Sequence, residues 1–248
     1  MKFVIANWKM NLSVEQSIAL AKDYLRIFKE TPAEIVVCPS FTSLAFVAKI
    51  LSASALAIGA QDVFWRTSGS YTGEVSATDL RDLGAGYVII GHSERRALGE
   101  TDRMVNRKLQ TILENEPLCP VLCIGERSDD RATGQFESVL ARQLTEALAG
   151  IELAGRNLIV AYEPVWAIGS GETPTNEEIE YVAELIRACL RKQLGREADE
   201  ACAVLYGGSV TAESAREIST IPIIDGFLVG GASLDAREFY RIAQCVVE

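Results

Sequence analysis

Histidine is almost absent from this sequence: among 248 residues there is only one, His92. A metal-dependent hydrolase needs several histidine and acidic ligands, so a single histidine argues against that class. The sequence also lacks a G-x-S-x-G elbow, a Walker lysine motif and a GxGxxG motif after its first apolar run. These absences argue against a serine hydrolase, a P-loop nucleotidase and a nicotinamide-dependent enzyme. We therefore expect a site without a metal ion or an organic cofactor.

Positive charge is also scarce, because 24 Lys and Arg residues face 34 Asp and Glu residues, for a net charge of −10. An acidic protein is a poor partner for nucleic acid or for an anionic membrane surface. No apolar run approaches the length of a membrane span, and the amino-terminal run is too short for a signal peptide. We expect no nucleic-acid or membrane partner. An anionic small-molecule substrate would have to be captured by local positive groups.

The six cysteines have no CxxC spacing. Cys119 and Cys123 come nearest to a metal-binding pair, but residues four apart on a strand lie about 13 Å apart, too far to share an ion. Most of the cysteines fall within apolar runs, which is typical of reduced core thiols in a cytoplasmic protein. We therefore expect a cytoplasmic location.

Short β-branched runs alternate with amphipathic helical segments along the whole chain. Ser13–Gln16 and Thr175–Glu178 have the pattern of capping boxes. The apolar residues at helical spacing behind them are Ile18, Ala21, Leu25 and Phe28 in the first case and Ile179, Val182, Ile186 and Leu190 in the second. Such alternation predicts a parallel sheet covered by helices. Eight units without a linker favour a closed (β/α)₈ barrel that forms a single α/β domain over residues 1–248, with an open doubly wound sheet as the alternative. The predicted strands are Phe3–Asn7, Glu34–Cys38, Leu56–Gln61, Tyr87–Gly91, Pro120–Gly125, Asn157–Tyr162, Ala201–Gly207 and Ile223–Gly230.

Glu163 stands directly after the sixth predicted strand. In a (β/α)₈ barrel the chemistry lies at the carboxyl ends of the strands. The apolar segment Val165–Ile168 and the sequence Gly169-Ser170-Gly171 follow, an order typical of a base under a flap with a glycine hinge. A surface glutamate before an ordinary loop is the alternative interpretation.

His92, Lys9 and Asn7 also follow predicted strands or end them. Ser93 opens a helical segment whose N–H groups disfavour a positive imidazole at His92, and a neutral imidazole can donate a hydrogen bond to a carbonyl or enolate oxygen. Lys9 would supply the positive charge that an anionic substrate needs. A structural histidine and a solvated surface lysine are the alternatives.

Neighbouring polar residues have less definite roles. Glu94 and Arg95 would pair with Lys9, contact a neighbouring subunit or contact substrate, and the sequence leaves these alternatives open. Glu126 is expected to be a structural partner, because it leads straight into a charged helical segment.

Two glycine pairs close the last two predicted strands, in Gly207-Gly208-Ser209 and Gly230-Gly231. Glycines let backbone N–H groups approach a ligand, and barrels often bind phosphate in the loops after strands seven and eight. Two tight turns would explain the pairs equally well, but together with Gly169 they favour a phosphate site. One carboxylate, one imidazole, one lysine and an anion cradle suit proton abstraction next to a carbonyl in a small phosphorylated substrate.

The sequence resembles the triosephosphate isomerase family in six segments that run in family order over essentially the whole chain. These segments are Asn7–Asn11, Gly91–Arg96, Cys123–Glu126, Ala161–Gly169, Tyr206–Val210 and Asp225–Leu234. The resemblance implies a TIM barrel and a glycolytic and gluconeogenic enzyme. It would interconvert dihydroxyacetone phosphate and D-glyceraldehyde 3-phosphate through an enediolate, without metal or cofactor. A barrel that binds a phosphorylated metabolite without turnover is the alternative, and isomerisation of a larger phosphosugar is a third possibility.

By matching position, the resemblance implies that Glu163 moves the proton between two carbons and that His92 polarises the carbonyl. Lys9 would offset the negative charge and Asn7 would help to fix the substrate. The flap Val165–Ser170 would close over the substrate and exclude water. The residues that would bind the phosphate through backbone N–H groups are Gly169, Ser209, Gly230 and Gly231.

The long Asp62–Ser76 loop carries aromatic residues that need burial. In the family that it resembles, the corresponding loop docks into a second subunit, which implies a homodimer; a loop folded on its own barrel is the alternative. Three positions depart from the family pattern: Ser170–Glu172 at the end of the flap, Ser70-Tyr71 in the long loop and Leu12. None of them removes a chemical group that the implied mechanism needs.

Overall fold

The computed structural model describes residues 2–30, 33–168 and 172–246, and its strands form a closed parallel barrel in sequence order. The barrel closes where Phe3 pairs with Gly226, so the first strand lies beside the last. This pairing rules out the open doubly wound alternative. The strands are β1 (Phe3–Asn7), β2 (Glu34–Cys38), β3 (Ala57–Ala60), β4 (Ala85–Ile90), β5 (Cys119–Ile124), β6 (Leu158–Tyr162), β7 (Cys202–Tyr206) and β8 (Gly226–Val229).

The last strand is shorter than the predicted Ile223–Gly230, because β8 begins only at Gly226. This glycine has a φ of +143°, and a Cβ atom on it would lie 1.8 Å from the carbonyl oxygen of Phe3. A glycine is therefore needed where β8 meets β1. Ile224, which was predicted in the strand, instead closes a turn by donating its N–H to the carbonyl of Ile221.

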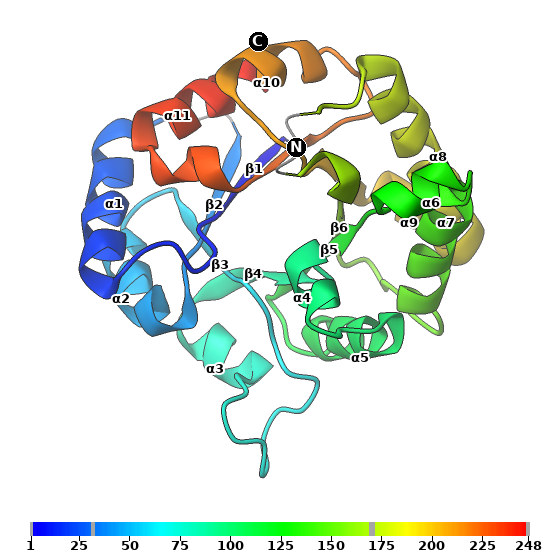
Figure 1. Cartoon of the computed structure of the whole chain (residues 1–248). Coiled ribbons are helices and arrows are strands. Elements are labelled where there is room, and N and C mark those ends of the chain that lie inside the picture. Colours follow the sequence, from blue (N-terminus) through cyan, green and yellow to red (C-terminus); the bar gives the residue numbers. More distant parts are fainter. Residues whose placement is uncertain (1, 31–32, 169–171, 247–248) are drawn as a thin grey trace.

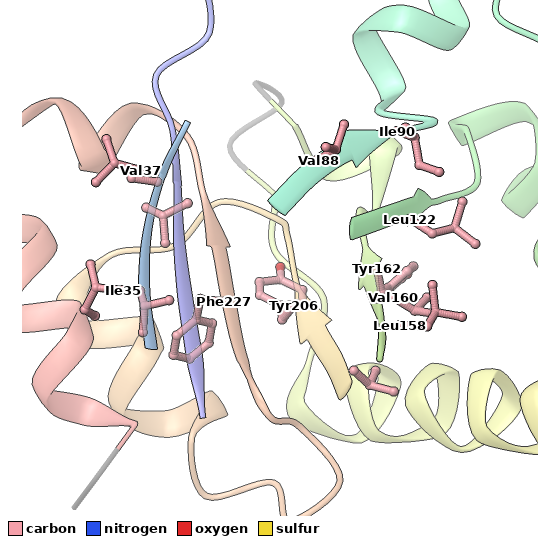
Figure 2. Close-up of a cluster of buried hydrophobic side chains, with 14 of the residues drawn as sticks. Ile35, Val37, Val88, Ile90, Leu122, Leu158, Val160, Tyr162, Tyr206 and Phe227 are labelled. Carbon is pink, nitrogen blue, oxygen red and sulfur yellow. The ribbon is translucent and has the colours of Figure 1, made fainter. Parts of the chain in front are cut away.

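Strand side chains alternate between two apolar clusters. One cluster contains strand residues together with helix residues, so it lies between the barrel and its helices; Figure 2 shows part of it, including Val37, Leu122 and Phe227. The other contains strand residues such as Ile5 and Leu205 and fills the inside of the barrel. Because successive strand residues point to opposite faces, the residue two after an inward-facing one points inward again. This alternation determines which strand-end residues reach the site.

Helices surround the strands in a ring (Figure 1). Two predicted capping boxes are present, at Ser13 and Thr175. The helices are α1 (Val14–Ile27), α2 (Phe41–Leu51), α3 (Ala77–Asp82), α4 (Ser93–Ala97), α5 (Asp102–Leu113), α6 (Ser128–Ala132), α7 (Phe136–Ala147), α8 (Asn176–Leu194), α9 (Arg196–Glu200), α10 (Ala212–Ile218) and α11 (Ala236–Cys245), with 3₁₀ helices η1 (Val165–Ala167) and η2 (Gly231–Leu234). Among the described helices, none combines the length and the apolar character that a membrane crossing requires.

The first and last helices pack together through aromatic rings. Tyr24 of α1 stacks on Phe239 of α11, with ring centroids 5.3 Å apart, and its hydroxyl donates to the carbonyl of Ser233 at 2.6 Å. Aromatic stacking of this kind stabilises a contact beyond the area that it buries. The hydrogen bond also holds η2, which follows β8, against the outer layer.

The Asp62–Ser76 loop, which connects β3 to α3, projects beyond the ring of helices (Figure 1). Its base is buried at Asp62, Val63 and Phe64, whereas residues 66–74 are all exposed. The rings of Phe64 and Tyr71 lie 4.6 Å apart, so the loop has a small aromatic core of its own. The loop thus has an ordered base and an exposed tip.

Candidate active site

Glu163 is the buried carboxylate at the end of β6, with 2% of its surface exposed. Ala161 faces the barrel interior, so the strand alternation turns Glu163 inward as well. Its N–H donates to the carbonyl of Ile124 at 2.8 Å. A Cβ atom on Gly125 would lie 1.8 Å from the carbonyl oxygen of Glu163. Gly125, which the sequence did not single out for the site, therefore permits the close approach of β5 to this position.

Both carboxylate oxygens of Glu163 accept hydrogen bonds. Oε1 lies 2.8 Å from Nε2 of His92, and Oε2 accepts the N–H of Ser93 at 2.9 Å. A buried carboxylate is costly unless such donors compensate it. The predicted base and the predicted imidazole, which are separated by 71 positions in sequence, are direct neighbours.

His92 is 5% exposed and occupies the N-cap position of α4. Its Nδ1 atom accepts the N–H of Glu94 at 3.2 Å. An imidazole nitrogen that accepts a hydrogen bond carries no proton, so the proton of a neutral ring lies on Nε2. Nε2–H is therefore the donor towards Glu163, and the helix start that the sequence predicted at Ser93 holds the ring in this tautomer.

Lys9 has a left-handed backbone with a φ of +52°, which is unusual for a residue other than glycine. Its N–H donates to Oδ1 of Asn7 at 3.1 Å, and its carbonyl accepts from Nε2 of Gln61 at 3.0 Å. Its ammonium group pairs with Oε1 of Glu94 at 2.8 Å. The backbone conformation of Lys9 is thus held from both sides. Of the roles that the sequence left open for Glu94, the structure shows the ion pair with Lys9. Arg95 instead pairs with Asp62 at 2.7 Å.

Glycines surround the space next to these side chains. A Cβ atom on Gly207 would lie 3.1 Å from Cγ of Glu163, and one on Gly208 would lie 2.2 Å from the hydroxyl of Tyr206. A Cβ atom on Gly230 would lie 3.6 Å from Nζ of Lys9. The glycines therefore leave room for the base and the lysine as well as for a ligand.

One cavity of about 280 Å³ unites most of the predicted residues. Its lining includes Asn7, Lys9, His92 and Glu163 together with Ser209, Gly230 and Gly231. Gly169, the remaining predicted phosphate-binding residue, lies outside the described residues. Further lining residues that the sequence reasoning did not assign to the site are Val210, Thr211, Leu228 and Ala232.

Leu228 shows which signal could have identified one of these residues. It stands two positions before Gly230 on β8 and belongs to the inward-facing cluster. Strand alternation would have placed it below Gly230 on the barrel axis. Among the described residues, no group of three or more His, Cys, Asp and Glu side chains is arranged to hold a metal ion.

The fold and the site together define a (β/α)₈-barrel protein with a buried carboxylate–imidazole pair at the carboxyl ends of its strands. The sequence model of the family described as triosephosphate isomerase matches residues 2–246. The chain therefore belongs to the triosephosphate isomerase family.

Individual relatives match over nearly their full length. The triosephosphate isomerase of Moorella thermoacetica is 47% identical over 241 residues, which cover 96% of both chains. That of Alkaliphilus oremlandii is 43% identical over 241 residues, covering 96% of this chain and 97% of the relative. That of Dictyoglomus thermophilum is 40% identical over 246 residues, covering 98% of both.

Proposed function

We propose that this protein interconverts dihydroxyacetone phosphate and D-glyceraldehyde 3-phosphate, on one barrel domain formed by residues 1–248. It is an aldose–ketose isomerase of glycolysis and gluconeogenesis. The observation that carries the proposal is the 2.8 Å contact between Oε1 of Glu163 and Nε2 of His92, in a cavity that Lys9 also lines. A barrel that only bound a phosphorylated metabolite would not need a carboxylate, an imidazole and an ammonium group around one small space.

Glu163 acts as the base. Its carboxylate takes a proton from C1 of dihydroxyacetone phosphate, which leaves an enediolate, and it returns the proton to C2, while a second proton passes from the oxygen on C1 to the oxygen on C2, so that C1 becomes the aldehyde and C2 carries the hydroxyl. The Nε2–H group of His92 donates a hydrogen bond to the substrate oxygen on which negative charge develops, and Lys9 stabilises the same charge. Asn7, which holds the N–H of Lys9, helps to fix the substrate.

Substrate binding changes the partners of the base. In the structure, Oε1 of Glu163 accepts the hydrogen bond from Nε2–H of His92. In the complex, a substrate oxygen would accept this hydrogen bond instead. When His92 turns its hydrogen bond to the substrate, Oε1 is released, while Oε2 stays held by the N–H of Ser93. The carboxylate oxygen that was bound to His92 is thereby free to accept the substrate proton when the substrate arrives.

The phosphate group binds to the backbone N–H groups of Ser209, Gly230 and Gly231, which line the same cavity, with Gly169 completing the set. A cavity of about 280 Å³ lies at the small end of the range of about 300–1,000 Å³ that is typical of ligand sites. This size favours a three-carbon phosphate over a larger phosphosugar. Val165–Ile168 shields the bound substrate from water, and Ile168 lines the cavity.

A coupled assay tests the proposal. Glyceraldehyde 3-phosphate is supplied, and dihydroxyacetone phosphate is measured through its reduction by glycerol-3-phosphate dehydrogenase. Wild-type protein should turn over, and the Glu163→Gln variant, which keeps the side-chain shape but has no basic carboxylate, should lose nearly all activity. An inactive wild-type protein that still binds the triose phosphate in calorimetry would favour the non-catalytic alternative.

The partner is a second copy of the chain, bound through the Asp62–Ser76 loop. Nine consecutive exposed residues, 66–74, project from the barrel (Figure 1), and Tyr71 at this tip is 43% exposed. Met10 and Leu98, which are 94% and 84% exposed, add apolar surface that an isolated barrel leaves in water. Sedimentation equilibrium at micromolar concentration should give twice the chain mass; the mass of one chain would contradict the dimer.

We place the enzyme in the cytoplasm. Cys38, Cys119, Cys123 and Cys189 are free thiols, as a reducing compartment would keep them. Fractionation of the producing cells, with activity followed by the same coupled assay, tests the location. Activity confined to a membrane or secreted fraction would contradict it.

A further inference from the structure

Arg131 of α6 contacts residues on both sides of the sequence Gly169-Ser170-Gly171. We infer that Arg131 is a positioning residue, which holds the segment behind Glu163 in place by fixing Trp166, Glu126 and the start of α8 at one point. The inference deepens the proposed isomerase function and rests on it. Arg131 does not line the cavity, so it would act on the reaction through the residues that it holds.

The guanidinium group of Arg131 uses both its edge and its face. Its Nε atom lies 3.0 Å from Oε1 of Glu126, and Nη1 lies 2.9 Å from Oε1 of Glu178. Its central carbon lies 4.3 Å from the ring centroid of Trp166 and 5.4 Å from that of Phe136. Only arginine combines several planar donors with a face that stacks on aromatic rings. The position therefore uses the particular chemistry of arginine, and a positive charge alone would not replace it.

Glu126, which pairs with Arg131, also binds residues on both sides of Glu163. Its Oε1 atom accepts from the hydroxyl of Tyr162 at 3.0 Å and from Nε1 of Trp166 at 2.8 Å, in addition to Arg131. Tyr162 directly precedes Glu163, and Trp166 follows it by three residues. The base thus lies on a short stretch of chain that is tied at both ends to one carboxylate oxygen.

Glu126 needs a cation because it is completely buried. Within the described part of the chain, its Oε2 atom has no hydrogen-bond partner. Burial raises the pKa of this carboxyl group above its ordinary value, although a backbone N–H, the hydrogen bonds from Tyr162 and Arg131 and the charge of Arg131 each lower it. Arg131 therefore helps to keep Glu126 ionised and able to accept all three hydrogen bonds. The sequence-based expectation that Glu126 is a structural partner is consistent with this arrangement.

Glu178 connects Arg131 to the far side of the same segment. It lies in the first turn of α8, where its Oε2 atom accepts the N–H of Thr175 in the capping box. Arg131 thus joins the residues just after the base to the residues at which α8 begins. Loss of Arg131 would free Trp166 and the α8 start from each other, and Glu163 would lose its fixed approach to the substrate.

Replacement of Arg131 should therefore lower kcat more than it raises KM. A displacement of about 1 Å at a reacting group can cost about 100-fold in rate. We expect a 10- to 100-fold fall in kcat for Arg131→Met, which keeps an unbranched apolar stem without charge or donors. KM should change less than threefold, because Ser209, Gly230 and Gly231 are untouched. Arg131→Lys restores the charge beside Glu126 and should recover part of kcat.

Arg191→Met is the matched control. Arg191 also pairs with a buried carboxylate, that of Asp199 at 3.2 Å, but it stands 13 residues after Glu178, about 20 Å along α8. The Arg191→Met variant removes an arginine ion pair and leaves the surroundings of Trp166 unchanged. The control should keep wild-type kcat even where its melting temperature falls by as much as that of Arg131→Met.

The pH profile separates positioning from a general loss of stability. Without Arg131 the pKa of Glu126 rises, so Glu126 becomes protonated as the pH falls and accepts the two remaining hydrogen bonds, from Tyr162 and Trp166, less strongly. The kcat deficit of Arg131→Met should deepen as the pH is lowered from 8 to 6, and the double variant Arg131→Met/Glu126→Gln should show no such deepening. Tyr162, Trp166 and Arg131 are the groups that face Glu126 in the structure, and Trp166 does not titrate.

A fluorine label reports on the contact without any assay. 5-Fluorotryptophan gives one signal each for Trp8, Trp65 and Trp166, assigned with Trp65→Phe and Trp166→Phe variants. Arg131→Met should shift the Trp166 signal alone. An unmoved Trp166 signal, or a kcat loss that equals that of Arg191→Met at every pH, would overturn the inference; if Arg131→Met does not fold, Arg131→Lys decides on the same two readouts. Wild-type protein without turnover would refute the proposed function. The fluorine spectra would still show whether Arg131 contacts Trp166.

Discussion

Oε1 of Glu163 lies 2.8 Å from Nε2 of His92, although the two residues follow different strands, β6 and β4. The contact exists because β4 and β6 both pair with β5, so that their carboxyl ends meet at one edge of the barrel. Its chemical consequence is that the proposed base and the proposed hydrogen-bond donor to the substrate are hydrogen-bonded to each other before substrate arrives.

Shortening the base tests its position. Glu163→Asp retracts the carboxylate by about one methylene, and proton transfer is sensitive to displacements of this size. We expect kcat to fall by about 100-fold or more, with KM changed less. Steady-state kinetics in the coupled assay measures both values. Glu184→Asp, at an exposed position on α8, is the control and should be indistinguishable from wild type; an unchanged kcat in Glu163→Asp would remove Glu163 from its role.

The tautomer of His92 can be observed directly, because it is the only histidine in the chain. Nδ1 accepts the N–H of Glu94, so the ring should carry its proton on Nε2. In tag-free protein labelled with ¹⁵N histidine, two-bond correlation spectra at pH 7.5 should show an unprotonated Nδ1 and a protonated Nε2. The reverse pattern would contradict the assigned donor.

Gly207 tests how closely β7 approaches the base. A Cβ atom there would lie 3.1 Å from Cγ of Glu163 and 3.3 Å from the carbonyl oxygen of Tyr162, so Gly207→Ala should displace the carboxylate. We expect a fall in kcat of about tenfold or more, since small misplacements of a reacting group are costly. Gly86→Ala is the matched control, because a Cβ atom on Gly86 meets nothing within 4 Å. Equal kinetics for the two variants would show that Gly207 has no special role.

Burial should make most of the thiols unreactive. It raises the pKa of Cys119 to about 12 and that of Cys202 to about 12, and it raises the pKa of the partly buried Cys189 as well. A thiol reacts as its thiolate, so labelling at pH 8 should be slow in folded protein and should reach all six cysteines only after denaturation. Mass spectrometry of a time course with iodoacetamide measures this. Rapid labelling of Cys119 or Cys202 in folded protein would contradict the expectation.

Much of the architecture followed from local pattern. Strands and helices alternate because buried parallel strands need continuous apolar runs and the helices that cover them need one apolar face. For α8 the residues predicted at helical spacing, Ile179, Val182, Ile186 and Leu190, are the ones that are buried. For α1 the pattern was less accurate: Ala21 and Phe28 are buried as expected, but Ile18 is only half-buried, and Ser17, Leu20 and Tyr24, which were not predicted, are buried. The aromatic contact between Tyr24 and Phe239 joins two helices that are distant in sequence, and it determines which face of α1 turns towards the core.

In the site, too, some residues could be predicted from local pattern and others depend on tertiary contacts. Glu163, His92 and Lys9 could be proposed from sequence because each is a chemically distinctive residue at a predicted strand end. Gly125 could not be proposed with the same reasoning, because its role depends on which atoms approach it from another strand. A Cβ atom 1.8 Å from the carbonyl of Glu163 is a property of two strands together.

By itself the sequence determined the class of fold, the residue types proposed as base and imidazole, and the strand ends near which they stand, because these features depend on local periodicity and on chemistry. Only the tertiary structure decided which groups touch. Closure of the barrel brought β4, β6 and β8 to one edge, so that His92 meets Glu163 and Lys9 lies beside Gly230. It also brought α6 against the segment behind the base, where Arg131 contacts Trp166. Contacts between residues far apart in the chain depend on the packing of the whole barrel, and no local pattern contains them.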